Sequence, residues 1–103
     1  MEATKSAKIE VLDGEDKCVL VLEGAVDIFF AGDLRAAALD AVRRGRDVAV
    51  ACDKLERLDT ATLQILLALK RELAQSNRNL DLSSLAGTPG DLAALAGLAG
   101  HLL

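Results

Sequence analysis

Residues 58–63 read Leu58-Asp59-Thr60-Ala61-Thr62-Leu63, and they mark the change from extended chain to helix that decides the fold. Before this stretch, Val48-Ala49-Val50-Ala51-Cys52 is a continuous apolar run, which is typical of a buried strand. After it, residues 60–75 contain no Gly or Pro and carry Leu and Ile at helical spacing. Side-chain oxygens such as those of Asp59 and Thr60 accept the free backbone N–H groups at the start of a helix. The sequence therefore predicts a strand, a turn and a helix over this region.

The part of the chain before this unit predicts two strands followed by a helix. Apolar and charged residues alternate over residues 7–12, and residues 18–22 form a second apolar run. The intervening Asp13-Gly14-Glu15-Asp16 is typical of a hairpin, in which we expect the glycine to supply a positive φ. We expect Gly24 to end the second strand. Residues 30–44 then show the periodicity of an amphipathic helix.

The last part of the chain predicts one more strand and one more helix. Residues 54–59 are expected to form a loop, and residues 79–83 a fourth, short strand. Thr88-Pro89-Gly90-Asp91 has the composition of a capped helix start. The predicted order is β-β-α-β-α-β-α. This order indicates the α/β class, with a mixed sheet of about four strands and three or more helices packed against it.

Composition indicates one domain with an unusual core. The chain has 103 residues, about half of them hydrophobic, and its aromatic residues are Phe29 and Phe30, with no Trp or Tyr. A domain of this length buries about 60–70% of the surface that its unfolded chain exposes. Leu, Ala and Val must therefore supply the packing. We expect a flexible leader over residues 1–6, one domain over residues 7–100 and a tail over residues 101–103.

Charge and hydropathy exclude several classes of partner. The net charge of −4 disfavours nucleic acid and anionic membranes, which bind basic surfaces. Arg43-Arg44-Gly45-Arg46 is the one basic cluster, and it coincides with the predicted end of a helix, where cations are stabilised. No apolar stretch approaches the ~20 residues of a membrane span, and no secretory signal is present. We therefore expect no membrane insertion and a cytoplasmic protein.

The sequence offers little for catalysis. His101 is its only histidine, and there is no Gly-rich phosphate loop. Cys18 and Cys52 lie inside apolar runs and are expected to be buried thiols. Asp27 and Asp59 stand at predicted loops, where carboxylates are typical of caps and turns rather than of a metal site. We therefore expect no enzymatic activity, no metal and no cofactor.

Helical geometry separates the two hydroxyls at the start of the predicted second helix. At about 100° per residue, Thr62 projects into the arc of Leu and Ile side chains, so we expect its hydroxyl to be buried and bonded to backbone. Thr60 projects to the opposite side, near Gln64 and Arg71, and we expect it to be exposed. Asp59 and Thr60 also fit an ordinary helix cap, and that purely structural interpretation stays open.

Phe29 and Phe30 follow Asp27 in the predicted connection between the second strand and the first helix. Adjacent residues of a regular element cannot both face inward, so one ring would be exposed and would be a suitable anchor for a partner protein. An irregular turn would instead let both rings pack into the core. The sequence leaves both interpretations open.

Three stretches, in order, resemble the STAS domain family, the family of bacterial anti-sigma factor antagonists. Val19-Leu20-Val21-Leu22-Glu23-Gly24-Ala25-Val26-Asp27-Ile28 is similar to the second strand of the family and its L-x-G-x-[VL]-D-[IA] signature. Leu34-Arg35-Ala36-Ala37-Ala38-Leu39 is similar to the L-R-x-x-L helix that follows. Leu58-Asp59-Thr60-Ala61-Thr62-Leu63-Gln64-Ile65-Leu66-Leu67-Ala68-Leu69 is similar to the D-S-S-G-L helix start. The resemblance covers roughly residues 15–100.

The resemblance implies a sheet with helices packed on it and a switch at the start of the second helix. In the antagonists, an anti-sigma kinase phosphorylates the second Ser of D-S-S-G, and the unphosphorylated antagonist binds that kinase. Here Thr60, Ala61 and Thr62 take the places of Ser, Ser and Gly, so the usual acceptor position has no hydroxyl. Thr60 is the remaining candidate for phosphorylation, ahead of Thr62. An Asp-Thr start also occurs in family members that serve lipid-transport ATPases and in members encoded beside chemosensory proteins.

The resemblance thus implies a non-enzymatic regulatory interaction module of the anti-sigma factor antagonist type, acting in signal transduction and transcription regulation. The resemblance implies a protein partner, in the first place an ATP-binding kinase of the anti-sigma or chemosensory type. The alternatives are a subunit of a lipid-transport ATPase or chemosensory complex, and a sensor of a nucleotide or other small ligand. A weak homodimer is also left open. The expected partner-binding residues are Asp27, Phe29, Phe30, Asp59, Thr60, Ala61 and Gln64.

Overall fold

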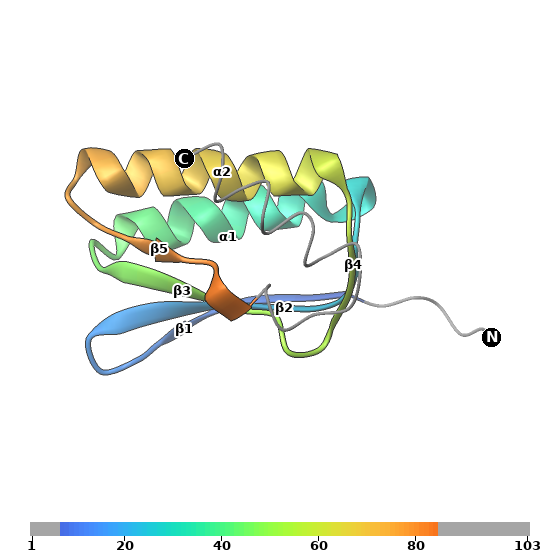
Figure 1. Cartoon of the computed structure of the whole chain (residues 1–103), viewed down its shortest axis with the longest axis horizontal. Coiled ribbons are helices and arrows are strands. Elements are labelled where there is room, and N and C mark those ends of the chain that lie inside the picture. Colours follow the sequence, from blue (N-terminus) through green and yellow to red (C-terminus); the bar gives the residue numbers. More distant parts are fainter. Residues whose placement is uncertain (1–6, 85–103) are drawn as a thin grey trace.

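The structure is a computed structural model, and it describes residues 7–84. A five-stranded sheet is covered on one face by two helices that lie side by side (Figure 1). Neither helix of this part of the chain is long and apolar enough to cross a membrane. The elements are β1 (Ala7–Asp13), β2 (Lys17–Val26), the 3-10 turn η1 (Ile28–Phe30), α1 (Ala31–Arg43), β3 (Asp47–Ala51), β4 (Leu55–Leu58), α2 (Thr60–Gln75) and β5 (Leu80–Asp81).

The sheet is mixed, and its order is β1-β2-β3-β5, with β4 also paired to β2. β1 and β2 are antiparallel, whereas β2 is parallel to both β3 and β4, and β3 is parallel to β5. Gly24 lies opposite Ala7 on one side and Leu55 on the other, so β4 extends the sheet on the side of β3. Parallel neighbours require crossover connections, and α1 and α2 supply them. The α/β class predicted from the sequence is confirmed.

The core lies between the sheet and the two helices. Along β2, Cys18, Leu20 and Leu22 are fully buried, while the residues between them are half-buried on the opposite face. Burying one leucine contributes about 2 kcal/mol, and aliphatic side chains supply most of this core. The helical core residues are Leu34, Ala38 and Ala41 in α1, and Leu63, Leu66, Leu67, Leu69 and Leu73 in α2.

The positions of two predicted helices are confirmed. α2 covers Thr60–Gln75, as its periodicity predicts, and α1 covers Ala31–Arg43, which agrees with the predicted range to within one residue at each end. The predicted fourth strand is present as β5, although it is shorter than expected. The helix predicted at Thr88, the leader, the tail and His101 lie outside the described residues.

Two predictions about the strands are wrong. The segment predicted as a loop, residues 54–59, contains β4, so the sheet has five strands rather than four, and β2 continues past Gly24. Gly24 has a φ of 80°, its N–H donates to the Lys54 carbonyl at 3.0 Å, and the register with β4 shifts after it. Because this bulge-like irregularity accommodates the glycine, β2 continues to Val26 instead of ending at Gly24. β4 was missed because its pairing with β2, which buries Leu55 and Leu58, joins segments that are distant in sequence.

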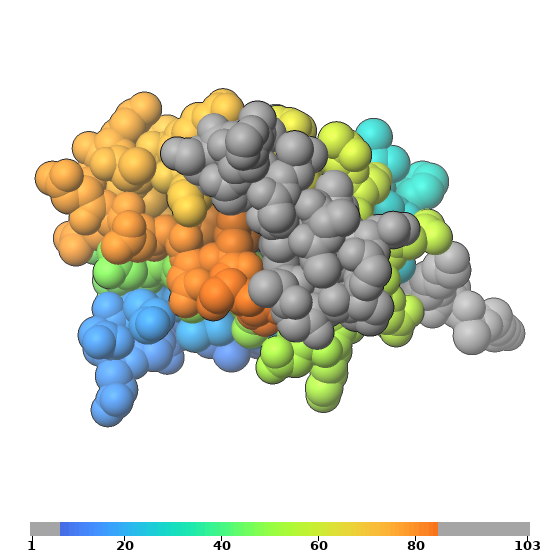
Figure 2. Space-filling view, viewed as in Figure 1, coloured from blue at the N-terminus to red at the C-terminus, as the bar shows by residue number. Residues whose placement is uncertain are grey.

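The predicted hairpin between β1 and β2 forms, but its glycine is needed for a different reason. Among the described glycines, positive φ occurs at Gly24 and Gly45 rather than at Gly14. The Gly14 N–H donates to the Lys17 carbonyl oxygen at 2.8 Å, and a Cβ on Gly14 would lie 2.7 Å from that oxygen. The turn therefore requires a residue without a side chain because the backbone approaches itself closely. The hairpin projects at one end of the molecule (Figure 2).

Replacing Gly14 with Ala should destabilise the fold, because the new methyl group would overlap the Lys17 carbonyl. We expect the free energy of unfolding to fall by about 1–3 kcal/mol. Gly32→Ala is the matched control, since nothing lies within 4 Å of a Cβ at that position of α1. Alanine is favoured in a helix, so this variant should gain about 0.5–1 kcal/mol. Urea denaturation measures both changes, and a Gly14→Ala variant as stable as the parent would contradict the close approach.

Candidate docking site at the start of the second helix

α2 begins at a capped turn. Asp59 is extended (φ −90°, ψ 173°), and its Oδ1 accepts a hydrogen bond from the Thr62 backbone N–H at 2.9 Å. Its carbonyl oxygen accepts the first helical bond, from the Leu63 N–H, at 3.0 Å. The carboxylate thereby satisfies one of the free N–H groups of the first turn. Asp59 is the cap of α2, and Thr60 is the first helical residue.

The Thr62 hydroxyl joins the start of α2 to the end of β2. Thr62 is fully buried, and its Oγ1 lies 2.8 Å from Asp59 Oδ1, 2.9 Å from the Asp59 carbonyl oxygen and 3.2 Å from the Val26 carbonyl oxygen. A hydroxyl carries one proton, so it donates to one of these three acceptors at a time. The prediction that this hydroxyl is buried is confirmed, and two of its three acceptors are backbone carbonyls, as predicted.

The Asp59 carboxyl is held in its ionised form. Its pKa is lowered, first by the hydrogen bond from the Thr62 backbone N–H, and further by the Thr62 hydroxyl, the Ile28 backbone N–H and the charge of Arg57. Partial desolvation raises the pKa of Asp59 but does not outweigh these interactions. A negative charge is also favoured at the N-terminus of a helix. At neutral pH the cap of α2 is therefore a carboxylate.

A second capped turn presents an aromatic ring beside the helix start. Asp27 Oδ1 accepts from the Phe29 N–H at 3.0 Å, and the Asp27 carbonyl accepts from the Phe30 N–H at 2.9 Å, which folds η1. Phe29 is 88% exposed and Ile28 is 63% exposed. Phe30 is half-buried, packs against the core and lies beside β1. Of the two interpretations of the Phe pair, the one with a single exposed ring is confirmed.

The first turns of α2 present the other predicted residues. Thr60, Ala61 and Gln64 are all exposed, in contrast to Thr62 between them. The prediction that Thr60 and Thr62 face opposite ways is therefore confirmed. Ala61 and Gln64 line one groove together with Ile28, so η1 and the start of α2 form a continuous surface. The structure thus brings the predicted residues together, except Phe30, which is directed toward β1.

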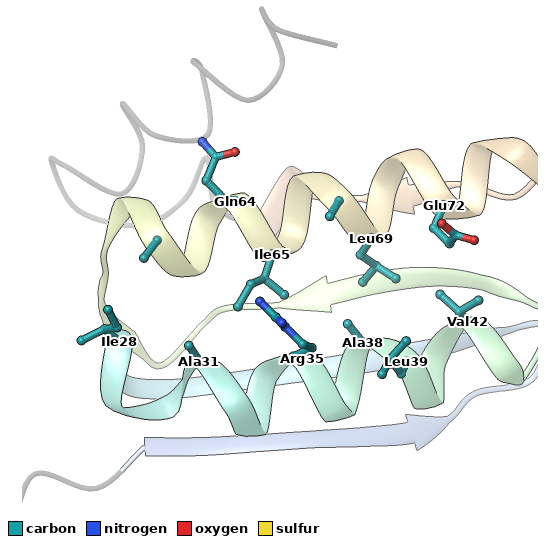
Figure 3. A pocket seen from close by; sticks show the side chains of 12 residues that line it. Ile28, Ala31, Arg35, Ala38, Leu39, Val42, Gln64, Ile65, Leu69 and Glu72 are labelled. Atoms are coloured by element: carbon teal, nitrogen blue, oxygen red, sulfur yellow. The ribbon is translucent and has the colours of Figure 1, made fainter.

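This groove runs between α1 and α2 and has a volume of about 640 Å³. Ile65 and Leu69 of α2 and Leu39 and Val42 of α1 form much of its wall. Arg35 extends from α1 toward Ile65, as Figure 3 shows. The groove is therefore mainly aliphatic and opens at one end on η1.

The sequence reasoning missed this groove. Leu39 is 53% exposed, and it lies outside the buried stripe of α1. An apolar residue on the outer side of an amphipathic helix was the signal that would have pointed to it. Ile28 was missed for another reason, since its exposure depends on the 3-10 turn that precedes α1.

The metal-ligating and thiol groups of the described residues are scattered or buried. Residues 7–84 contain no cluster of three or more His, Cys, Asp or Glu side chains placed to hold a metal ion. Cys18 and Cys52 are buried free thiols, as predicted. Burial and the nearby charge of Asp53 raise the pKa of Cys52 to about 11, so its thiol is protonated at neutral pH.

The Asp59 cap should make stability depend on pH in the acid range. Because folding lowers the pKa of Asp59, its carboxylate stabilises the fold above the ordinary aspartate pKa of ~4, and this contribution is lost as pH falls through the folded-state pKa. Asp59→Ala should reduce the free energy of unfolding by about 1 kcal/mol at neutral pH. The difference from the parent should shrink at about pH 3. Chemical denaturation at both pH values measures it.

Asp16→Ala is the control for this experiment, because Asp16 is an exposed aspartate of the hairpin turn. Its difference from the parent should stay near zero at both pH values. An Asp59→Ala deficit of equal size at neutral pH and in acid would contradict the role of the ionised carboxylate.

Comparison with known proteins agrees with this fold. Residues 11–103 match the family described as "Mlab, STAS domain". A search of curated proteins gives no significant match to the sequence. Among solved structures, the fold is similar to that of the Bacillus cell fate determinant SpoIIAA in its phosphorylated form, with a TM-score of 0.70 and 18% sequence identity over 92% of this chain and 84% of that chain. Because the family match spans most of the sequence, this chain belongs to the STAS domain family.

Proposed function

We propose that this STAS domain is a non-enzymatic, cytoplasmic regulatory module that binds another protein through a docking surface on η1 and the first turns of α2. The exposure of Phe29 carries the proposal, because an aromatic ring that is 88% exposed beside a second apolar side chain is typical of a protein interface. The docking surface consists of Asp27, Ile28, Phe29, Asp59, Thr60, Ala61 and Gln64.

The backbone that carries the Phe29 ring is held in place before any partner arrives. The Asp27 cap fixes the backbone of the turn, and Phe30 anchors the next residue on the core. A turn whose backbone is already ordered loses little backbone entropy on binding, so more of the contact energy appears as affinity. This supports a binding role for the Asp27 turn beyond its local capping.

The helix start adds polar contacts and permits a close approach. Ala61 is exposed and has the smallest side chain of the surface, so a partner backbone can lie near α2 at this point. Thr60 and Gln64, on either side of it, offer a hydroxyl and an amide for hydrogen bonds. Asp59 serves mainly to hold this turn, through its bonds with Thr62.

The first candidate partner is an ATP-binding kinase of the anti-sigma or sensory type, which would make the module a regulator of transcription. The likeness to SpoIIAA supports phosphorylation as a form of control in this fold, since that structure is of the phosphorylated protein. Thr60 is the accessible hydroxyl here, because Thr62 is buried and Ala61 has none. A phosphate on Thr60 would add about −1.5 to −2 charges to the docking surface.

The second candidate is a subunit of a transport ATPase. Ala61 favours it, because an exposed alanine at the position of the usual phosphoacceptor removes the ordinary switch. The description of the matching family, "Mlab, STAS domain", also favours it, since the Asp-Thr start resembles STAS domains that serve lipid-transport ATPases. In this case the docking surface would hold the ATPase without being modified.

Binding to a captured partner tests the docking surface. The immobilised chain is used to capture an ATP-binding protein from the native host, and the purified partner is then titrated with variants. Phe29→Ala should weaken binding about tenfold or more, because the aromatic ring that the partner would bury is lost. Leu12→Ala is the matched control, as Leu12 is 45% exposed but lies in β1, and it should bind like the parent. Equal affinity of Phe29→Ala and the parent would contradict the proposal.

Intact mass after incubation with the captured protein and Mg·ATP separates the candidates. One added phosphate that Thr60→Ala abolishes would identify a kinase. An unmodified chain that stays bound while the partner hydrolyses ATP would identify an ATPase subunit. A rise in melting temperature of the chain alone with nucleotide would instead favour the small-ligand sensor.

A further inference from the structure

β1 is an edge strand of the sheet in the part of the chain that the structure describes. Among the described strands it pairs only with β2, and it lies at the margin opposite β5 (Figure 1). The opposite margin consists of the two-residue β5 and the four-residue β4, whereas β1 has seven residues and no proline. A strand of this length exposes a row of backbone N–H and C=O groups that another strand can pair with.

The side chains of β1 divide into an apolar row and a charged pair. Ala7, Ile9 and Val11 face α1 and line a groove of about 480 Å³ together with Phe30. Lys8 and Glu10 alternate with them and so lie on the opposite face of the strand. The Lys8 Nζ lies 3.3 Å from Glu10 Oε1, and these side chains are 55% and 43% exposed. Both charges are therefore accessible to a strand placed along the edge.

We propose that a second copy of this chain pairs with β1 in antiparallel fashion about a two-fold axis at Ile9. In such a pair, directly opposite residues point to the same face, so the axis must pass through a residue. An axis at Ile9 places Lys8 opposite Glu10 of the second copy, and this contact occurs twice by symmetry. An axis at Lys8 would oppose two lysines, and an axis at Glu10 would oppose two glutamates. Charge complementarity therefore selects the register at Ile9.

The apolar side chains of β1 are also compatible with an axis at Ile9. Ile9 meets its own copy, and Ala7 lies opposite Val11, so the row that faces α1 continues across the axis. On α1, the side chains that line this groove include Ala36, which is small and leaves room for the second copy.

The same groove contains acidic groups that limit the affinity. Asp33 and Asp40 line it from α1, and Asp40 forms an ion pair with Arg44 at 3.0 Å. Two copies would bring these carboxylates toward each other, and like charges in proximity oppose association. The homodimer formed through β1 is therefore weak.

Charge exchange at β1 tests this pairing. Lys8→Glu places glutamates opposite each other in the dimer, and Glu10→Lys places lysines opposite each other, so each should weaken self-association about tenfold. An equimolar mixture of the two variants restores both opposite-charge pairs, as does the double variant, and both should associate like the parent. Sedimentation equilibrium of the full chain at up to about 1 mM measures the dimer dissociation constant of the parent, the two single variants, their mixture and the double variant.

Lys54→Glu and Glu56→Lys are the matched controls, because they make the same charge changes at exposed positions near β4. Both should associate like the parent, and thermal melting should show that every variant is folded. A parent chain that stays monomeric would overturn the proposal. In that case an extended segment of another protein would be the remaining candidate to pair with β1. Single variants that associate like the parent, or a mixture no stronger than either variant alone, would also overturn it.

Discussion

The hydroxyl of Thr62 ties together two parts of the chain that are 36 residues apart, the end of β2 and the start of α2. The two turns that carry the candidate site lie on either side of this contact. The Asp59 cap shares it, because the same carboxylate accepts from the Thr62 N–H and lies within reach of the hydroxyl. The Asp27 turn leaves β2 one residue after Val26, so the position of this contact also sets where Phe29 emerges. The buried Thr62 thus lies between the two turns that present the exposed Phe29 and Thr60.

Local signals predicted α2 and its cap well, because periodicity, a capping carboxylate and the absence of Gly and Pro all act within one segment. They also predicted which way Thr60 and Thr62 face, since that follows from helical geometry. β4 was missed because its pairing depends on β2, which lies some thirty residues earlier in the chain. The groove was missed for the same reason, as its two walls, at Leu39 and Ile65, belong to separate helices.

The two surfaces of the molecule are separate. The groove beside β1 and the groove between the helices share no lining residue, and α1 lies between them. Ala37 of α1 faces β1, whereas Ala38 and Leu39 face α2. Pairing at the sheet edge would therefore leave the groove between the helices, and with it Ile28, Ala61 and Gln64 of the docking surface, open in each copy. Such a dimer would present two docking surfaces, and a partner with two binding sites would gain affinity through avidity.

A core built without tryptophan or tyrosine has a consequence for spectroscopy. The chain contains two phenylalanines as its only aromatic residues, and Phe29 points into solvent. The protein therefore shows neither the near-ultraviolet absorbance of tryptophan and tyrosine nor tryptophan fluorescence. In any complex, those signals originate from the partner alone, so the environment of the partner's own indole rings can be followed through assembly without labels.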